Sequence, residues 1–270
     1  LGFWHWDGAV YVKDATLSPL IGYDLIFSTA DFDNLILSDA PNGNWLFIND
    51  VTLTANTTLP SNTNLFFNGG VISGAFTLTG DKTRIDPTTY EKFVGVTLAG
   101  TWNVERCYAE WFGAVGDGAT DDADAIQSAL NFPATTVLLG REYFIADDVE
   151  LVAVRNVIGE DSVLKCRSFR VNDDNVEVRG VEFESNQVDV AAFDILRVSA
   201  NLKNITIKNC KFTAASAGAG LGYAIGVVMG GGVGEEGENI SVLDCKFTRC
   251  GVQLGRTNKF IVSNCYFDMD

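Results

Sequence analysis

Carboxylates are the side chains of this sequence that are best suited to catalyse a reaction. Two carboxyl groups can cleave a glycosidic bond, at about 5 Å apart with retention and about 6.5–9.5 Å apart with inversion of the anomeric centre. The candidates are Asp173, Asp174, Glu182 and Glu184. Such a pair can come from neighbouring strands and has no fixed spacing in sequence. The sequence therefore leaves the catalytic residues unknown.

Histidine and cysteine offer fewer possibilities. The chain has a single histidine, His5, so a mechanism with a histidine base has no residue to use in the rest of the sequence. Its six cysteines are spread widely and none lies in a C-x-x-C pattern, which argues against zinc. We expect no cofactor.

The charge of the chain restricts its partners. Nineteen Lys and Arg against 35 Asp and Glu give a formal net charge of −16, which repels nucleic acid and anionic lipid. Hydrophobic residues make up 47% of the 270 residues, yet no run of about 18 apolar residues could insert into a membrane. Carboxylates and amides suit the hydroxyl groups of neutral sugars instead.

A repeat in the second half must position the candidate carboxylates. Its four copies share alternating apolar residues and start 29, 35 and 20 residues apart, with a looser fifth copy at Asn156. The copies are 175–183 (NVEVRGVEF), 204–212 (NITIKNCKF), 239–247 (NISVLDCKF) and 259–267 (KFIVSNCYF). A repeat copy of constant length, followed by a return loop of variable length, is typical of a solenoid. In a solenoid each coil buries its apolar face on its neighbours.

Each copy predicts a strand, a corner and a second strand. The corners fall at residue types that tolerate left-handed backbone angles, and the second strand turns a Phe inward. The corner residues are Gly180, Asn209, Asp244 and Asn264. Cys210, Cys245 and Cys265 should then stack in the core as small apolar side chains. A disulfide, for instance between Cys245 and Cys250, is the alternative.

The Gly- and Asp-rich stretch 113–130 predicts a tight turn followed by a helix. Thr120 or Asp121 could cap this helix, and Ala125, Ile126, Ala129 and Leu130 form its apolar stripe. Its carboxylates would repel a phosphate, and they lack the alternating spacing of an EF-hand, although calcium stays an alternative. We interpret the stretch mainly as a helical cap over the open end of the coils.

The segment 110–127 (EWFGAVGDGATDDADAIQ) resembles a motif of the pectate lyase superfamily, and its EWFGA form is most like phage tailspikes and capsule depolymerases. The likeness covers residues 105–270. It implies an all-β fold, a right-handed single-stranded parallel β-helix with a short N-terminal capping α-helix. It also implies a homotrimer that binds, and often cleaves, bacterial surface polysaccharide. The usual polygalacturonase motifs are absent, which argues against pectin hydrolysis by their residues.

The first hundred residues predict a smaller β-rich region. An aromatic hairpin over 2–12 would turn at Asp7-Gly8, and short strands from Trp45 to Ile72 would form early coils or a separate neck. We divide the chain into a β-rich segment 1–44, a candidate for virion attachment, a neck or early coils with a connector at 45–107, and a β-helix at 108–270. That β-helix is expected to continue beyond Asp270. The chain begins at Leu1 without a basic and apolar leader, so we expect either a processed form or a piece of a longer protein.

Three hypotheses follow for the function. The first is a phage tailspike or tail-fibre protein of the virion, acting at the host cell surface on polysaccharide and joined to other tail or baseplate proteins through its N-terminal region. The second is a secreted bacterial polysaccharide lyase or glycoside hydrolase. The third is a structural tail component without enzymatic activity. The Gly-rich return loop 217–238 could border a binding groove or be a loop without a ligand.

Overall fold

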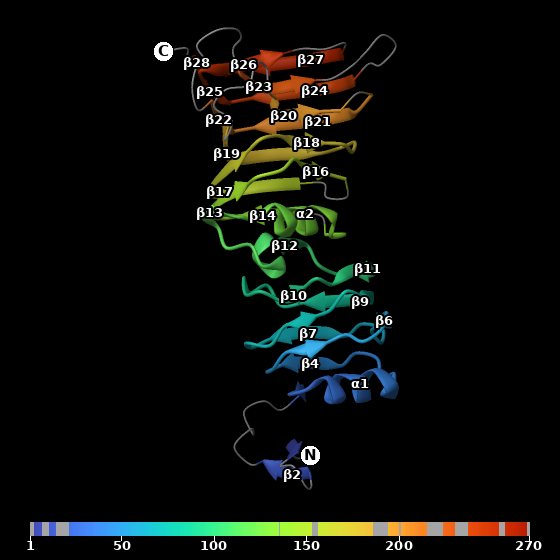
Figure 1. Ribbon diagram of the computed structural model, residues 1–270. Coiled ribbons are helices and arrows are strands. Elements are labelled where there is room, and N and C mark those ends of the chain that lie inside the picture. The colour runs from blue at the N-terminus through green and yellow to red at the C-terminus, as the bar shows by residue number, and fades with distance from the viewer. Residues whose placement is uncertain are drawn as a thin grey trace.

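The computed structural model shows a chain that is nearly all β-strand, wound into about ten stacked parallel coils with two short α-helices (Figure 1). It describes residues 3–6, 11–14, 22–134, 136–152, 156–185, 194–199, 201–214, 224–229, 237–253 and 257–268. The predicted all-β parallel β-helix is therefore confirmed.

The upper coils form the β-helix that the repeat predicts. Successive strands of the order β12-β14-β17-β19-β21-β24-β27 pair in parallel, and other strands extend the same sheet around the corner. The described strands of this larger sheet are β12 (Arg106–Tyr108), β13 (Asp117–Asp121), β14 (Thr136–Leu139), β15 (Glu142–Ile145), β17 (Asn156–Cys166), β19 (Glu177–Ser185), β21 (Lys203–Lys208), β22 (Lys211–Thr213), β24 (Gly237–Leu243), β25 (Lys246–Thr248), β27 (Thr257–Ser263) and β28 (Tyr266–Asp268). A smaller parallel sheet closes each coil and consists of β16 (Val149–Leu151), β18 (Phe169–Val171), β20 (Asp194–Val198), β23 (Ala224–Met229) and β26 (Cys250–Gln253).

The lower coils stack in the same way between residues 24 and 102. Their strands are short and pair in parallel. They are β3 (Asp24–Ile26), β4 (Asn44–Phe47), β5 (Val51–Thr52), β6 (Thr57–Thr58), β7 (Asn64–Phe67), β8 (Ile72–Ser73), β9 (Thr77–Ile85), β10 (Phe93–Val94) and β11 (Thr97–Trp102). Ahead of them, β1 (Phe3–Trp6) and β2 (Tyr11–Asp14) pair as the expected antiparallel hairpin, whose Asp7-Gly8 turn lies outside the described residues. The domain boundaries at 44 and 107 stay predictions.

Helix α1 (Thr29–Ser38) was not predicted, since the first 44 residues were described as β-rich. Its N-cap is Ser28, whose Oγ accepts from Asp31 N at 3.2 Å, while Asp31 Oδ2 accepts from Phe27 N, the residue before the cap, at 3.1 Å. The helix buries Phe32 against Trp45 and Phe47, at ring distances of 5.8 and 6.1 Å. It thus covers the N-terminal end of the lower coils (Figure 1).

Helix α2 (Ala123–Asn131) is the predicted capping helix, and it buries the expected stripe of Ala125, Ile126, Ala129 and Leu130. It lies between the lower and upper coils, beside the 3-10 helix η2 (Ala109–Phe112) (Figure 1). The N-cap prediction of Thr120 or Asp121 was wrong, because both residues extend β13 and the N-cap is Asp122. The Asp122 carboxylate turns back to accept from Val115 N and Gly116 N instead, which continues the tight turn into the helix.

The predicted corners have left-handed backbone angles. Their φ values are +69° at Gly180, +52° at Asn209 and +53° at both Asp244 and Asn264. A second line of corners opens the repeat copies at Asn175, Asn204 and Asn239, where Asn204 Nδ2 donates to Asn175 Oδ1 at 2.8 Å and Asn239 Nδ2 donates to Asn204 Oδ1 at 3.0 Å. Asn204 and Asn239 therefore each bind the preceding coil through the side-chain amide, in addition to turning the chain.

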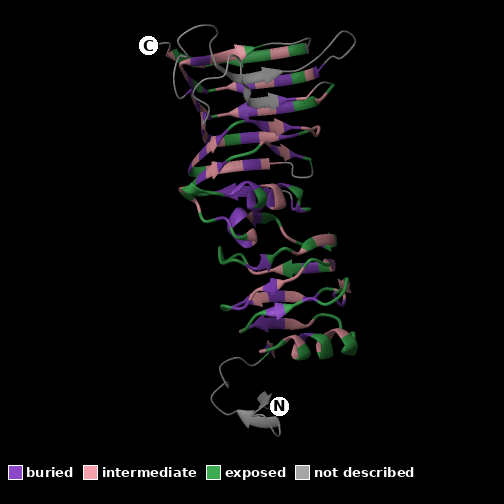
Figure 2. Cartoon of the chain, in the orientation of Figure 1, coloured by how far each residue is buried: buried purple, intermediate pink, exposed green. Residues whose placement is uncertain are grey.

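Buried side chains line the inner side of the coils (Figure 2). Phe183, Phe212, Phe247 and Phe267 form a stack with ring distances of 5.2, 5.0 and 4.9 Å. All six cysteines are free, and the thiols of Cys210, Cys245 and Cys265 each contact a carbonyl oxygen of the coil below, as the predicted stack requires. Among the described helices, none is both long and apolar enough to cross a membrane.

Candidate functional site

Glu182 and Glu184 lie on the outer side of β19. Strand alternation turns Val181, Phe183 and Ser185 into the core and leaves the two glutamates half-buried on the outer face. Two residues of a strand span about 7 Å along the backbone, a spacing from which two glutamate side chains can reach the carboxyl separation of inverting glycosidases. Of the four predicted candidates, these two are therefore the pair that the fold brings to one face.

Neighbouring coils place lysines beside these glutamates. In register, Glu182 lies between Val163 and Lys211, and Glu184 lies between Lys165 and Thr213. The outer residues of β15, β17, β19, β22 and β25 together form what we call the charged stripe. Its members are Glu142, Lys165, Glu182, Glu184, Lys211 and Lys246.

Ion pairs run along the charged stripe from coil to coil. Lys165 pairs with Glu142 and Lys211 pairs with Glu182, and all four side chains are 27–46% exposed. The hydrogen bond to Glu142 raises the pKa of Lys165. Further along, Lys246 Nζ lies 5.8 Å from the centre of the Tyr266 ring. The charged stripe thus presents both acceptors and donors, with Lys211 next to Lys246 in register, and ends at an aromatic ring.

An open groove of about 340 Å³ lies at the edge of the charged stripe. It follows the corners of three coils, where Asp161, Gly180 and Asn209 have positive φ angles. The full lining is Asp161, Ser162, Val163, Gly180, Val181, Glu182, Asn209 and Lys211. Carboxylate, ammonium, amide and hydroxyl groups meet here, and these groups can donate to and accept from sugar hydroxyls.

Asp173 and Asp174 lie in a different part of the coil, in the turn between β18 and β19. Asp173 Oδ1 accepts from Asp174 N at 2.8 Å, and Asp174 Oδ1 accepts from Lys203 N of the next coil at 2.7 Å. The strand residues 176–179 separate this turn from the Gly180 corner by about 13 Å. That distance is longer than the separation of the two carboxyl groups in a glycosidase. Neither Asp173 nor Asp174 can therefore form a catalytic pair with Glu182.

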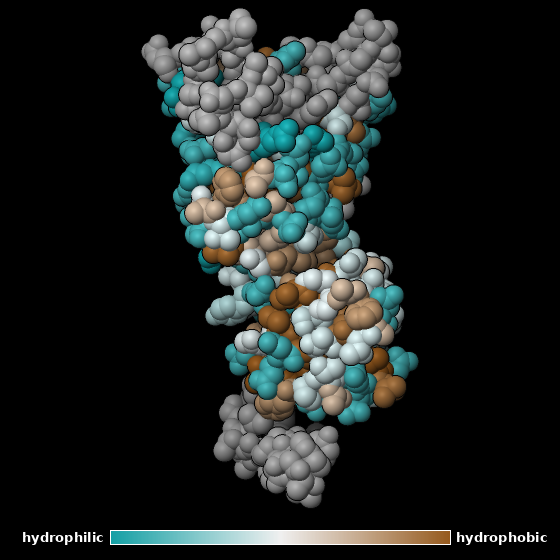
Figure 3. Space-filling model, viewed as in Figure 1, coloured by the Kyte–Doolittle hydropathy of each residue, from teal (hydrophilic) through white to brown (hydrophobic). Residues whose placement is uncertain are grey.

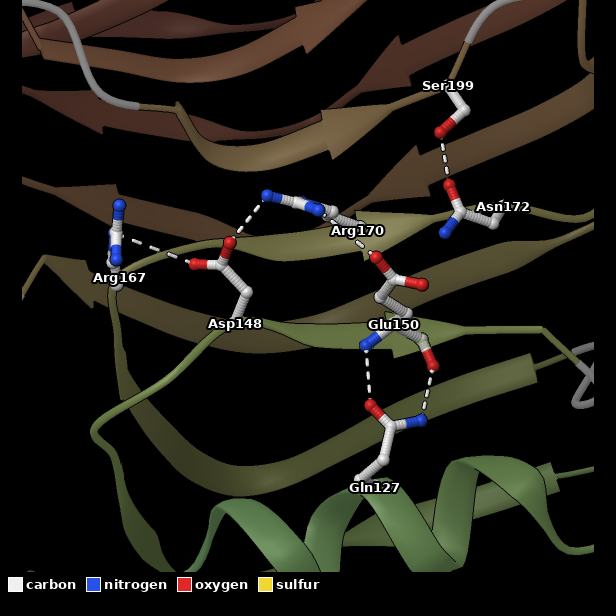
Figure 4. A network of polar contacts seen from close by, with 7 residues as sticks. All are labelled: Gln127, Asp148, Glu150, Arg167, Arg170, Asn172 and Ser199. Carbon is white, nitrogen blue, oxygen red and sulfur yellow. Dashed lines mark hydrogen bonds and ion pairs between the residues drawn. The ribbon is translucent and has the colours of Figure 1, made fainter.

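A polar network on the smaller sheet was not predicted from the sequence (Figure 4). Arg170 of β18 pairs with Asp148 and with Glu150 Oε1, the latter at 3.1 Å, and Arg167 Nε lies 3.7 Å from Asp148 Oδ1. Gln127 of α2 joins this network through two 2.8 Å hydrogen bonds to the backbone of Glu150. The two arginines and two carboxylates compensate one another, so we interpret the network as a brace between α2 and the first upper coils.

This network could have been predicted by aligning the sequences of successive coils. Glu150 and Arg170 occupy matching positions of β16 and β18, but these two short strands precede the clear copies of the repeat. Ser199 and Asn172, which are hydrogen-bonded between successive coils, could also have been found only by such an alignment (Figure 4).

Metal and thiol chemistry find little support in the described part of the chain. No three His, Cys, Asp or Glu side chains gather there as a metal site. Asp117, Asp121 and Asp122, the residues considered for calcium, each accept from backbone amides. Burial raises the pKa of the Cys166 thiol to about 12 and that of Cys250 to about 11, so both stay protonated at neutral pH. The His5 side chain lies outside the described residues.

By architecture, then, this is a parallel β-helix protein with a polar groove along one line of corners. A relative found by sequence comparison is a depolymerase specific for capsule K30/K69 from Klebsiella phage K64-1. The two are 30% identical over 148 residues, which cover 49% of this chain and 19% of the relative. The chain thus spans about a fifth of the length of that protein. This likeness confirms the resemblance to phage capsule depolymerases, whereas no family model and no solved structure matches the sequence.

Proposed function

We propose that this chain binds bacterial surface polysaccharide as the β-helical part of a phage tailspike or tail-fibre protein. The observation that carries the proposal is the groove along the coil corners, where Glu182 and Lys211 present charged hydrogen-bonding groups at the edge of the charged stripe. An extended polymer fits such a surface, because each coil repeats the same outward positions about 4.8 Å further along the axis.

The relative supports the substrate class and the phage context. Its name describes a depolymerase that is specific for a bacterial capsule, and it comes from a phage. A secreted bacterial enzyme, the second hypothesis, has no comparable observation in its favour. Binding of polysaccharide also separates this proposal from a purely structural tail component, which would bind none.

Cleavage of the bound polymer is the finer part of the proposal. Glu182 and Glu184 are the candidate pair, since they share the outer face of β19 with a backbone spacing that allows the carboxyl separation of an inverting enzyme. In that role, one carboxyl group would protonate the leaving oxygen and the other would activate water. Asp173 and Asp174 serve as turn residues in this account, through their bonds to Asp174 N and Lys203 N.

The remaining features of the proposal concern assembly. The protein acts as a homotrimer in the phage tail, at the host cell surface, and its N-terminal region joins other tail or baseplate proteins. Exposed apolar side chains on the lower coils, among them Leu37 at 82% and Tyr90 at 66% exposed, supply surface for such contacts.

The direct experiment measures binding and polymer size together. The chain is incubated with purified capsular polysaccharides, including the K30 and K69 types, and analysed by titration calorimetry and size-exclusion chromatography. We expect saturable binding to at least one polymer, and a shift to shorter products if Glu182 and Glu184 are catalytic. Absence of binding across the panel would favour the structural component, and binding without shortening would remove the catalytic assignment alone.

A further inference from the structure

A smaller cavity of about 190 Å³ lies where the lower coils meet the upper ones, and it shares no lining residue with the groove. We call it the junction pocket. Its walls come from the segment before β10, from β12, η2, β14, the loop between β14 and β15, and the middle of β17. They consist of Thr89, Tyr108, Glu110, Leu138, Leu139, Gly140, Arg141 and Glu160.

Glu110 is held rigidly in the wall of the junction pocket. Its side chain is only 8% exposed, and its Oε1 accepts from Tyr143 OH at 2.8 Å and lies 3.3 Å from Arg141 Nε. Burial, and next the charge of Glu110, raise the pKa of Tyr143, which therefore stays a neutral donor. Within the described part of the chain, both contacts are to Oε1, so Oε2 is a fixed acceptor without a protein donor.

The other walls complete a set of groups that suits a sugar. The Tyr108 ring packs 5.6 Å from the Trp111 ring and offers an aromatic surface, on which the C–H face of a pyranose can lie. Glu160 is exposed and Arg141 is half-exposed, so that an acceptor and a donor stand at the rim. Two carboxylates against one guanidinium make the pocket net negative, which disfavours an acidic sugar.

The size of the pocket limits its ligand. Pockets for drug-sized molecules have volumes of roughly 300–1,000 Å³, and 190 Å³ is smaller. We propose that the junction pocket binds a single neutral sugar residue, with Glu110 Oε2 and Glu160 accepting from its hydroxyls and Tyr108 packing on its ring. The ligand class rests on the proposed function, whereas the site itself is independent of the charged stripe.

Titration of the chain with monosaccharides tests this site. D-glucose, D-galactose and D-mannose serve as neutral probes and D-glucuronate as the acidic one, followed by NMR chemical shifts. We expect saturable binding of at least one neutral sugar in the millimolar range, with D-glucuronate at least about tenfold weaker. No saturation by any of the three neutral sugars, or tighter binding of D-glucuronate, would overturn the proposal.

Two variants locate the binding. Glu160→Gln changes an exposed residue and should fold, and we expect it to weaken the affinity for the bound sugar about tenfold through the loss of a charge-assisted hydrogen bond. Glu238→Gln, at a 40% exposed glutamate that lines neither the junction pocket nor the groove, is the matched control and should leave this affinity within about twofold. An unchanged affinity of Glu160→Gln contradicts the site. If monosaccharides bind at Glu160 but long polymers do not bind at all, the proposed function fails while the junction pocket stands.

Discussion

Lys92 is a residue whose importance only the three-dimensional structure reveals. Its side chain is fully buried, with Nζ 2.9 Å from Asp86 Oδ1 and 4.7 and 5.5 Å from the ring centres of Phe67 and Trp111. Phe67 belongs to the lower coils and Trp111 to η2. The ammonium group therefore ties the two stacks of coils together through an ion pair and two cation–π contacts.

Replacement of Lys92 should change how stability depends on pH. Burial lowers the pKa of Lys92 below 10.5, so between the lowered value and 10.5 the unfolded chain holds the proton more tightly than the folded chain. The free energy of unfolding contributed by Lys92 therefore rises with pH through that window. We expect the difference between wild type and Lys92→Met to grow as pH approaches 10.5, measured by urea unfolding at several alkaline pH values.

An exposed lysine provides the control for this experiment. Lys203 is 55% exposed in its ion pair with Glu238, so Lys203→Met replaces a lysine at the surface, and the same measurement on it gives the effect of removing a lysine that is not buried. A difference for Lys92→Met that does not grow with pH would contradict the burial of the Lys92 ammonium group.

Single residues differed in how far the sequence could predict them. The corner positions were predictable, because Gly180, Asn209 and Asp244 break an alternation that is visible in the repeat. The partners of Glu110 and Lys92 were not, because their contacts depend on how non-repeating segments fold back onto the coils. Tyr143, for example, is 33 residues from the Glu110 that it hydrogen-bonds.

At the scale of elements, the stack of phenylalanines holds the upper coils together. Phe212 is fully buried between Phe183 and Phe247, with ring planes within 7° of parallel. Phe212→Ala should lower the free energy of unfolding by about 3–5 kcal/mol, because it removes a large buried side chain and leaves a cavity. Chemical denaturation measures this loss. Thr206→Ala, on the outer side of β21, should cost less than about 1 kcal/mol, and equal losses would contradict the inward placement of Phe212.

The line of corner asparagines makes a separate prediction. Asn239 has φ +54° and donates to Asn204, so Asn239→Ala loses a hydrogen bond and strains the corner. We expect a loss of about 1–2 kcal/mol in the free energy of unfolding. Asn239→Gly should lose less, because glycine adopts the left-handed angle without strain. A glycine variant that is less stable than the alanine variant would show that backbone strain does not matter at this corner.

Elements with a repeating pattern were predicted well, and isolated ones less well. The strands of the four copies were found because each copy repeats the same alternation and corner. Helix α1 was missed although Ser28 is a good N-cap residue, since the prediction for residues 1–44 rested on the hairpin over 2–12. The groove could not be predicted either, because it depends on how far the corners of adjacent coils protrude.

At the scale of the whole molecule, hydrophobic and hydrophilic residues are distributed unevenly over the face that Figure 3 shows. In the view of Figure 3, hydrophilic residues cover much of the described upper coils, whereas hydrophobic residues are more frequent over the lower ones. Phe76 and Val94 are exposed there at 38% and 42%, in addition to Leu37 and Tyr90. Such exposed apolar side chains are frequent at protein–protein contacts.

Association of three copies is the corresponding prediction. We expect sedimentation equilibrium to give three times the 29.2 kDa mass of the chain. Exchange of the exposed apolar residues Leu37 and Tyr90 for serine should shift the distribution toward the monomer, whereas Thr206→Ala should not. A strictly monomeric wild type over the accessible concentration range would contradict the trimer for this chain.

The central claim, that polysaccharide binds in the groove at the edge of the charged stripe, is tested most directly by calorimetric titration of two double variants with a capsular polysaccharide that wild type binds. Glu182→Ala/Lys211→Ala removes the ion pair at the groove, and Lys203→Ala/Glu238→Ala removes a comparably exposed ion pair outside it. Each should cost less than about 1 kcal/mol of stability. We predict at least about tenfold weaker binding for the groove variant and a change within about twofold for the control. Equal affinities of the two variants would contradict the assignment of the groove.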